Sequence, residues 1–131
     1  MTTLEIDPAL AHKLAGRLRN MNVRVAVGDG AEMPFDDATF SAAVCFTMLH
    51  HVPSTGAQDR LLKEVRRVLR PGGMFAGTDS RWSRGLQWMH YRDTFVPVDP
   101  GPFAERLARA GFSGVKIALQ SRVFRFHAVR A

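Results

Sequence analysis

Short apolar runs alternate with helical patterns along most of the chain. Val23, Val25 and Val27 alternate with other residues, which is the period-two pattern of a strand with one buried face. Residues 41–47 are continuously small and apolar, as expected for a strand that is covered on both faces. In residues 58–69 the apolar side chains instead recur every three or four positions with basic ones between them, which predicts an amphipathic helix.

The remaining elements follow from the same patterns and from turn residues. Arg70-Pro71-Gly72-Gly73 is predicted to end the amphipathic helix in a sharp turn. The alternation of strands with helices favours a parallel α/β sheet, and the last two strands are close enough for an antiparallel hairpin. The predicted fold class is therefore α/β, mostly parallel with an antiparallel C-terminal hairpin, in one domain that covers residues 1–131. We predict strands at 2–6, 23–27, 41–47, 74–78, 115–119 and 123–129, helices at 8–20, 58–69 and 101–110, and an irregular segment at 80–100.

Composition narrows the class of protein. The chain has 131 residues, of which 46% are hydrophobic and 23% charged, as in ordinary globular domains. Its single cysteine, Cys45, excludes an internal disulfide and lies in an apolar run, where we expect an inert core thiol. No apolar stretch approaches the roughly 20 residues that span a bilayer, and the first residues lack the pattern of a secretory signal. We therefore expect a cytoplasmic protein with no membrane partner.

The net charge of +6 raises the question of an anionic partner. The basic residues are scattered, with only Arg66 and Arg67 adjacent, and no aromatic residues interleave with them as a stacking platform. A nucleic-acid partner is therefore not favoured, although a basic nucleic-acid-associated protein stays a rival hypothesis supported by charge alone.

Acidic residues follow two of the predicted strands. Glu5 lies at the end of the first strand, and Asp29 follows the second one. Open α/β sheets bind ligands at the carboxyl ends of their strands, where such carboxylates can accept hydrogen bonds from ribose hydroxyls. The plainer alternative is that these acids are helix caps or turn residues, as Asp7 before Pro8 would be.

Two histidines, His50 and His51, follow the apolar strand 41–47. A histidine there could act as a base or contact a substrate, but a polar pair that merely begins a loop is the more common situation. The sequence shows no spaced set of Cys, His or carboxylate ligands, so no metal site is predicted. Asp79 is another strand-end acid, which either contacts a ligand or caps the loop. The segment that follows either lines a pocket over the strand ends or packs onto the core through its aromatic residues; its members are Trp82, Trp88, Met89, His90 and Tyr91.

The order of these segments resembles the methyltransferase type 11 group of class I S-adenosylmethionine-dependent methyltransferases. Residues 4–8 look like the end of the family's second strand, and residues 27–35 are similar to its GDAExLPF segment. Residues 37–51 look like the fourth strand and its flanks, and residues 64–73 are similar to the ExxRVLKPGG element. The resemblance implies a Rossmann-like sheet and the transfer of a methyl group to a small-molecule acceptor.

The resemblance also implies roles for individual residues. Glu5 matches the acid that binds the cofactor's ribose hydroxyls, and Asp29 with Gly30 would lie near the adenine. His50 or His51 would be the base. The positions predicted to bind S-adenosylmethionine are Glu5, Asp29, Gly30, Ala31, Thr47 and Met48.

One feature of the family is not seen in this sequence. Its first strand and GxGxG loop precede the second strand, and here only Met1 to Thr3 stand before that match. We therefore expect a truncated sheet that is incomplete at its N-terminal strand. Either the second strand pairs directly with the fourth, or another chain covers the exposed edges in a homodimer. The alternative to an enzyme is an inactive truncated domain that serves as a dimeric binding or scaffold module.

Overall fold

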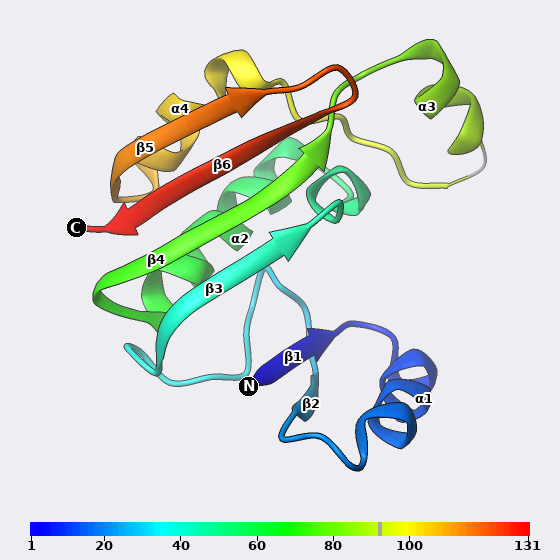
Figure 1. Ribbon diagram of the computed structural model, residues 1–131, viewed down its shortest axis with the longest axis vertical. Helices are drawn as coiled ribbons and strands as arrows, with labels where there is room; N and C mark the ends of the chain where they lie inside the picture. The colour runs from blue at the N-terminus through cyan, green and yellow to red at the C-terminus, as the bar shows by residue number, and fades with distance from the viewer. Residues whose placement is uncertain (92) are drawn as a thin grey trace.

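The computed structural model describes residues 1–91 and 93–131. Two strands and a helix come first, and a larger unit of four strands with helices follows (Figure 1). The strands are β1 (Thr2–Glu5), β2 (Arg24–Val27), β3 (Phe40–Phe46), β4 (Leu69–Ser80), β5 (Phe112–Leu119) and β6 (Val123–Arg130). The helices are α1 (Pro8–Leu18), the short 3-10 helix η1 (Leu49–His51), α2 (Thr55–Val68), α3 (Arg84–Met89) and α4 (Pro100–Arg109).

The larger sheet has the strand order β3-β4-β6-β5. β3 pairs parallel with β4, while β6 pairs antiparallel with both β4 and β5. The hairpin between β5 and β6 closes where the Gln120 amide donates to the Val123 carbonyl at 2.9 Å. The predicted architecture, a parallel sheet with an antiparallel C-terminal hairpin, is confirmed.

The turn predicted at residues 70–73 is instead part of β4. α2 ends at Val68, but the chain continues as a strand from Leu69, whose partner is Phe40. The pairing then jumps to Ala42 opposite Met74, so the Pro71–Gly73 segment bulges out of the ladder. Gly72 allows this bulge because its φ of 76° is one that glycine adopts without strain.

The segment predicted as irregular at residues 80–100 contains the short helix α3. Ser83 caps this helix, since its hydroxyl oxygen accepts the Leu86 amide at 3.0 Å. The segment carries few periodic apolar positions, so hydrophobic patterning did not reveal the helix. α4 begins one residue earlier than predicted, with Asp99 as its N-cap and Pro100 in its first turn.

The N-terminal unit is a parallel pair of strands, β1 and β2, with α1 between them in sequence. Asp7 caps α1 as expected, because its Oδ1 accepts the amides of Ala9 and Leu10 at 2.7 and 3.2 Å. Within residues 1–91 and 93–131, β1 pairs with β2 and not with β3. Of the two alternatives for the incomplete sheet, direct pairing of the strand 2–6 with the strand 41–47 is therefore wrong for the part of the chain that the structure describes, and cover by another chain stays a prediction.

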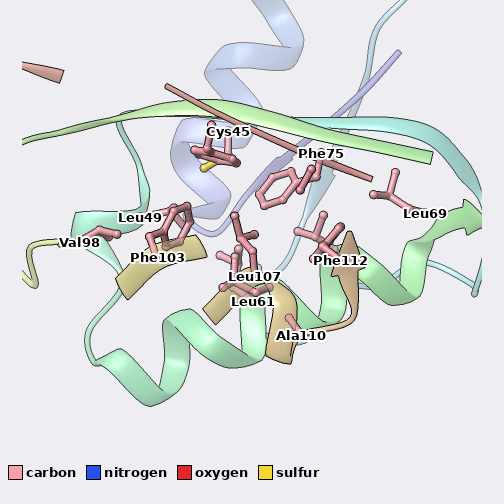
Figure 2. Close-up of a cluster of buried hydrophobic side chains, with 14 of the residues drawn as sticks. Cys45, Leu49, Leu61, Leu69, Phe75, Val98, Phe103, Leu107, Ala110 and Phe112 are labelled. Carbon is pink, nitrogen blue, oxygen red and sulfur yellow. The ribbon is translucent and has the colours of Figure 1, made fainter. Parts of the chain in front are cut away.

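The hydrophobic core lies between the four-stranded sheet and the helices α2 and α4, which cover one of its faces (Figure 1). Its side chains come from β3 to β6 and from both helices, as Figure 2 shows. On the opposite face, Val44 and Phe46 are 64% and 63% exposed, so the expectation that the strand 41–47 is covered on both faces is wrong for the described residues. None of the helices in the described parts of the chain is long and apolar enough to cross a membrane. The largest fully buried apolar side chains are Phe75, Phe103, Phe124, Leu49, Leu62, Leu69 and Leu107.

Candidate active site

The acidic residues predicted to bind a nucleoside lie together at the carboxyl end of the two-stranded sheet. Glu5 is opposite Val27 in the ladder, and the Gly28 amide donates to the Glu5 carbonyl at 3.0 Å. Asp29 follows directly, and its Oδ1 accepts the Ala31 amide at 2.8 Å, which fixes the turn. Both carboxylates therefore sit where parallel strands end, which is where open α/β sheets hold ligands.

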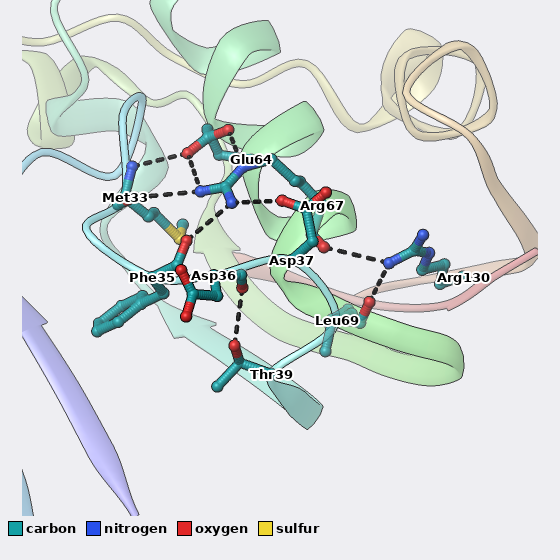
Figure 3. A network of polar contacts seen from close by, with 9 residues as sticks. All are labelled: Met33, Phe35, Asp36, Asp37, Thr39, Glu64, Arg67, Leu69 and Arg130. Atoms are coloured by element: carbon teal, nitrogen blue, oxygen red, sulfur yellow. Dashed lines mark hydrogen bonds and ion pairs between the residues drawn. The ribbon is translucent and has the colours of Figure 1, made fainter.

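The loop after β2 is anchored to α2 by a polar network (Figure 3). The Met33 amide donates to Glu64 Oε2 at 2.7 Å, and Arg67 donates to the carbonyls of Phe35 and Met33 at 2.8 and 3.1 Å. Arg67 also pairs with Asp37 and Glu64 at 2.8 and 2.7 Å. The network fastens the loop that carries Asp29 and Gly30 to the larger unit.

Opposite charges strengthen this network, which forms the junction between the loop after β2 and helix α2. The hydrogen bond from Arg67 holds the pKa of the Glu64 carboxyl below its usual value, and the Met33 amide acts in the same direction. The two acids in turn raise the pKa of the Arg67 guanidinium. Both partners are therefore ionised at neutral pH, and the loop is held by charge-assisted hydrogen bonds.

Gly30 provides a close approach at the same junction. A Cβ atom built at this position would lie 2.8 Å from Leu61 Cδ1. Leu61 belongs to the same core cluster as Leu49, which directly follows Met48. The Asp29–Ala31 turn is thereby held on the larger unit, on the residue cluster that also supports the end of β3.

Thr47 and Met48 follow the last residue of β3. Thr47 has a φ of 48°, a conformation that β-branched residues rarely adopt, and its amide donates to the Thr78 carbonyl at 2.8 Å. Such strain is held in place by its surroundings and is found mainly at functional sites. Met48 is 40% exposed and begins η1, so both predicted cofactor neighbours lie at the carboxyl end of a parallel strand.

His50 and Asp79 form a buried polar pair. His50 Nδ1 lies 2.5 Å from Asp79 Oδ1, and the two residues are 3% and 0% exposed. The Ser80 amide also donates to Asp79 Oδ1, at 2.7 Å. Asp79 thus orients the imidazole through Nδ1 and leaves Nε2 as the nitrogen for proton transfer or ligand binding.

His51 is exposed, and its ring lies against that of His50 with centroids 4.2 Å apart. Partial burial lowers the pKa of His51 below the usual histidine value, and the nearby His50 and His90 act in the same direction. Its imidazole is therefore mostly neutral at pH 7 and able to accept a proton.

A third histidine and a buried amide complete the site. His90 belongs to the segment that we expected either to line a pocket or to pack onto the core, whereas nothing in the sequence indicated a site role for Gln58. The Val96 amide donates to the His50 carbonyl at 2.8 Å. Gln58, which is 1% exposed, donates through Nε2 to the carbonyls of Leu49 and Val96 at 3.0 and 2.9 Å. The chain after α3 is thereby fixed over η1, and it brings His90 to within 4.9 Å of His51, centroid to centroid.

Cys45 is buried, as expected. Burial raises the pKa of its thiol to about 12, and the nearby Asp79 carboxylate adds to the rise. A thiol this far from ionisation is not a nucleophile at neutral pH, so the prediction of an inert core residue agrees with its surroundings.

Comparison with known proteins identifies the family. The sequence model of the methyltransferase domain family matches residues 1–77. The chain is 32% identical to a demethylmenaquinone methyltransferase of Corynebacterium kroppenstedtii, over 95% of this chain and 49% of that protein. It is 30% identical to a probable tRNA methyltransferase 9B of Bos taurus, over 75% of this chain and 22% of that protein. The chain therefore spans half or less of the length of these relatives.

The fold agrees with this assignment. The trans-methyltransferase CalH, solved in complex with S-adenosylhomocysteine, superposes with a TM-score of 0.81 at 19% identity. The superposition covers 99% of this chain and 42% of CalH. The predicted Rossmann-like α/β fold is thus confirmed, and S-adenosylmethionine is the cofactor of the family. The chain belongs to the methyltransferase domain family of S-adenosylmethionine-dependent methyltransferases.

Proposed function

We propose that this chain carries the cofactor and acceptor sites for methyl transfer from S-adenosylmethionine to a small-molecule nucleophile. The observation that carries the proposal is the placement of three strand ends. Glu5 ends β1, and Asp29 follows β2. Residues 47–51 follow β3, where His50 contacts the buried Asp79 near the end of β4. Carboxylates for a nucleoside and a base for an acceptor therefore lie at carboxyl ends of parallel strands.

The residues at the ends of β1 and β2 suit a nucleoside. Carboxylate oxygens accept hydrogen bonds from ribose hydroxyls. Glu5 Oε1 accepts the Asp7 amide at 3.0 Å, and this hydrogen bond fixes the direction of the Glu5 side chain. Gly30 lets the turn beside Asp29 lie close against Leu61, since a Cβ atom there would be 2.8 Å from Leu61 Cδ1. When bound, S-adenosylmethionine supplies a methyl group on a positively charged sulfur.

His50 is the base that the geometry favours. Glu5 and Asp29 would hold S-adenosylmethionine, which would supply its methyl group to the acceptor's lone pair and retain the electron pair of the sulfur–methyl bond on sulfur. The acceptor's proton then passes to an imidazole nitrogen, and Asp79 stabilises the imidazolium that results. His51 is the second candidate because its lowered pKa keeps it neutral.

The methyl acceptor that we propose is a small molecule. A small molecule suits a site formed by His50, His51, His90 and Phe95, whose rings lie 4.2 to 5.7 Å apart in neighbouring pairs. The relatives do not support the expectation that nucleic acid is disfavoured, since one is a probable tRNA methyltransferase. A small phenol or hydroxyl compound and a tRNA are therefore both tested as acceptors, and methylation of tRNA alone would overturn the small-molecule proposal.

Titration of S-adenosylhomocysteine into the chain by calorimetry tests the cofactor site. We expect binding at one site per chain that is weakened at least about tenfold in Glu5→Gln and Asp29→Asn, since each removes a charged hydrogen-bond acceptor. Glu105→Gln is the matched control, because Glu105 is an exposed acid on α4. No heat from a folded chain, or equal weakening in all three variants, would contradict the proposed site.

We also propose that the chain works as a homodimer. The supporting observation is the apolar face of the sheet that α2 and α4 leave open, where Val44, Phe46 and Met74 are 64%, 63% and 42% exposed. A hollow of about 510 Å³ lies on this sheet, next to Phe46. Exposed large apolar side chains that gather on one face of a sheet favour an interface there. Light scattering that gives the mass of one chain at micromolar concentration would contradict a dimer.

The cytoplasmic location stays a prediction.

A further inference from the structure

Three histidines from different parts of the chain converge beside the end of β3. His50 and His51 belong to η1, and His90 is the C-cap of α3. One ring nitrogen of each lies within 4.8 Å of the others. We propose that His50, His51 and His90 bind a divalent transition-metal ion, with Zn²⁺ as the first candidate, because neutral imidazole is a preferred ligand of this class of ion.

His50 is already oriented as a metal-binding histidine. In such sites the ring nitrogen that does not touch the metal usually donates to a carboxylate, which fixes the tautomer and the direction of the ring. His50 Nδ1 makes this contact with Asp79 Oδ1 at 2.5 Å, and Asp79 is fully buried. The other nitrogen, Nε2, is the one left for an ion.

His90 presents a nitrogen that needs a partner. Its Nδ1 is buried and makes no hydrogen bond within the described residues 1–91 and 93–131. The Asp93 carboxylate is 3.9 Å away, beyond hydrogen-bond distance. A buried polar atom without a partner destabilises the fold, and a metal ion would supply the missing contact.

The nitrogens of the three histidine rings lie near one another, close to the spacing of the ligands of a bound zinc ion. Zn–N bonds of about 2.0–2.1 Å place the nitrogens of a tetrahedral site about 3.3 Å apart. The nitrogens lie within 4.8 Å of one another, so they must close by at most about 1.5 Å. The exposed His51 has room to move, whereas His90 stacks on Phe95 with centroids 5.3 Å apart and His50 is fixed by Asp79.

Three histidine ligands leave a fourth position open, as in catalytic zinc sites. A water or an acceptor oxygen bound there would lose its proton more easily than in bulk solvent. The ion would occupy the nitrogens that otherwise accept the proton, so the metal-loaded form would activate the acceptor as a Lewis acid. The binding of metal does not depend on the proposed methyl transfer and is measured without cofactor.

No metal site is predicted from the sequence, because spacing along the chain shows only the adjacent pair His50 and His51. The third ligand comes from an aromatic segment without metal-ligand spacing. The Val96 amide on the His50 carbonyl and the two hydrogen bonds of Gln58 Nε2 bring that segment over η1. Only the fold juxtaposes the three rings.

The test is a titration of the chelator-treated chain with Zn²⁺ by calorimetry and with Co²⁺ by absorption spectroscopy, in the absence of cofactor. We expect one ion per chain and a cobalt spectrum of tetrahedral nitrogen coordination without the thiolate band that Cys45 would give. His51→Ala and His90→Ala should each weaken binding at least tenfold, and Asp79→Asn about 10- to 100-fold. His12→Ala, which removes an exposed histidine on α1, should leave it unchanged.

Two results would overturn the proposal. One is no binding of submillimolar Zn²⁺ or Co²⁺ to a chain that circular dichroism shows to be folded. The other is equal affinity in His90→Ala and His12→Ala, which would indicate adventitious binding to surface histidines. The S-adenosylhomocysteine titration is a separate measurement, so failure of the metal site and failure of the cofactor site are distinguishable.

Discussion

The N-terminal unit and the four-stranded unit are built from similar strands and helices, yet they differ sharply in burial. Of the buried hydrophobic residues, Ala11 alone comes from the part before residue 40, and the others lie in the unit from β3 to β6. In the N-terminal unit Ile6 and Leu10 are 64% and 51% exposed. Burial of apolar area is the main source of stability, so the two units should differ widely in their resistance to unfolding.

This difference matters because the predicted cofactor carboxylates lie on the weaker unit. Glu5 and Asp29 lie before residue 40, where Ala11 is the one buried hydrophobic residue among the described residues. The hydrogen bonds of Glu64 and Arg67 fasten the loop after β2 to the stronger unit. The histidine site instead rests directly on the core, through Leu49 and Gln58. We infer that the two halves of the proposed site differ in rigidity.

The largest difference in stability between the two units is expected from a matched pair of leucine truncations. Leu62→Ala in α2 removes a fully buried side chain and should lower the free energy of unfolding by about 2–5 kcal/mol. Leu10→Ala in α1 removes a half-exposed side chain and should lower it by less than about 1 kcal/mol. Urea denaturation followed by circular dichroism measures both. Equal losses would show that the N-terminal unit has a core of its own.

The junction provides the second test. Arg67→Met removes the guanidinium that binds Glu64, Asp37 and two carbonyls, and should cost about 1–3 kcal/mol because these acceptors lose their partner. Hydrogen exchange should rise in residues 28–39 and stay unchanged in β4 and β6. Arg60→Met, which removes an exposed arginine on the same helix, serves as control. Faster exchange across the whole chain would mean that Arg67 supports the core and not the junction.

The comparison also explains which features could be predicted from the sequence. The strands 23–27 and 41–47 and the helix α2 follow from apolar patterning, because apolar side chains at these spacings share one face of a strand or helix. The bulge at Pro71–Gly73 could not be predicted, since the same turn residues also end helices and the pairing with β3 decides between the two. Likewise, Asp79 was recognised as a strand-end acid, but its pairing with His50 depends on the register of β3 against β4.

Acid should loosen the junction through Glu64. Its pKa in the folded chain lies below the usual value of about 4.3, so the ionised carboxylate stabilises the fold above that value. This stability is lost as pH falls through the folded pKa, because protonation removes the acceptor for Arg67. Unfolding measured from neutral pH down to pH of about 3 should show a steeper loss in the native chain than in Glu64→Gln. Identical pH profiles would mean that the carboxylate contributes no net stability.

The smallest expected effect is a gain in stability, unlike the losses above, and it concerns the N-terminal unit. Gly16 is an exposed position within α1, and a Cβ atom built there meets no atom within 4 Å. Gly16→Ala should therefore stabilise α1 by about 0.5–1 kcal/mol, because alanine loses less backbone freedom on entering a helix. If the N-terminal unit opens on its own, hydrogen exchange in α1 slows roughly two- to fivefold while the denaturation midpoint of the core does not move. A denaturation midpoint that rises together with the slower exchange would instead mean that the two units unfold as one. The scarcity of buried residues before β3 would then not let the part of the site with Glu5 and Asp29 unfold independently of the core.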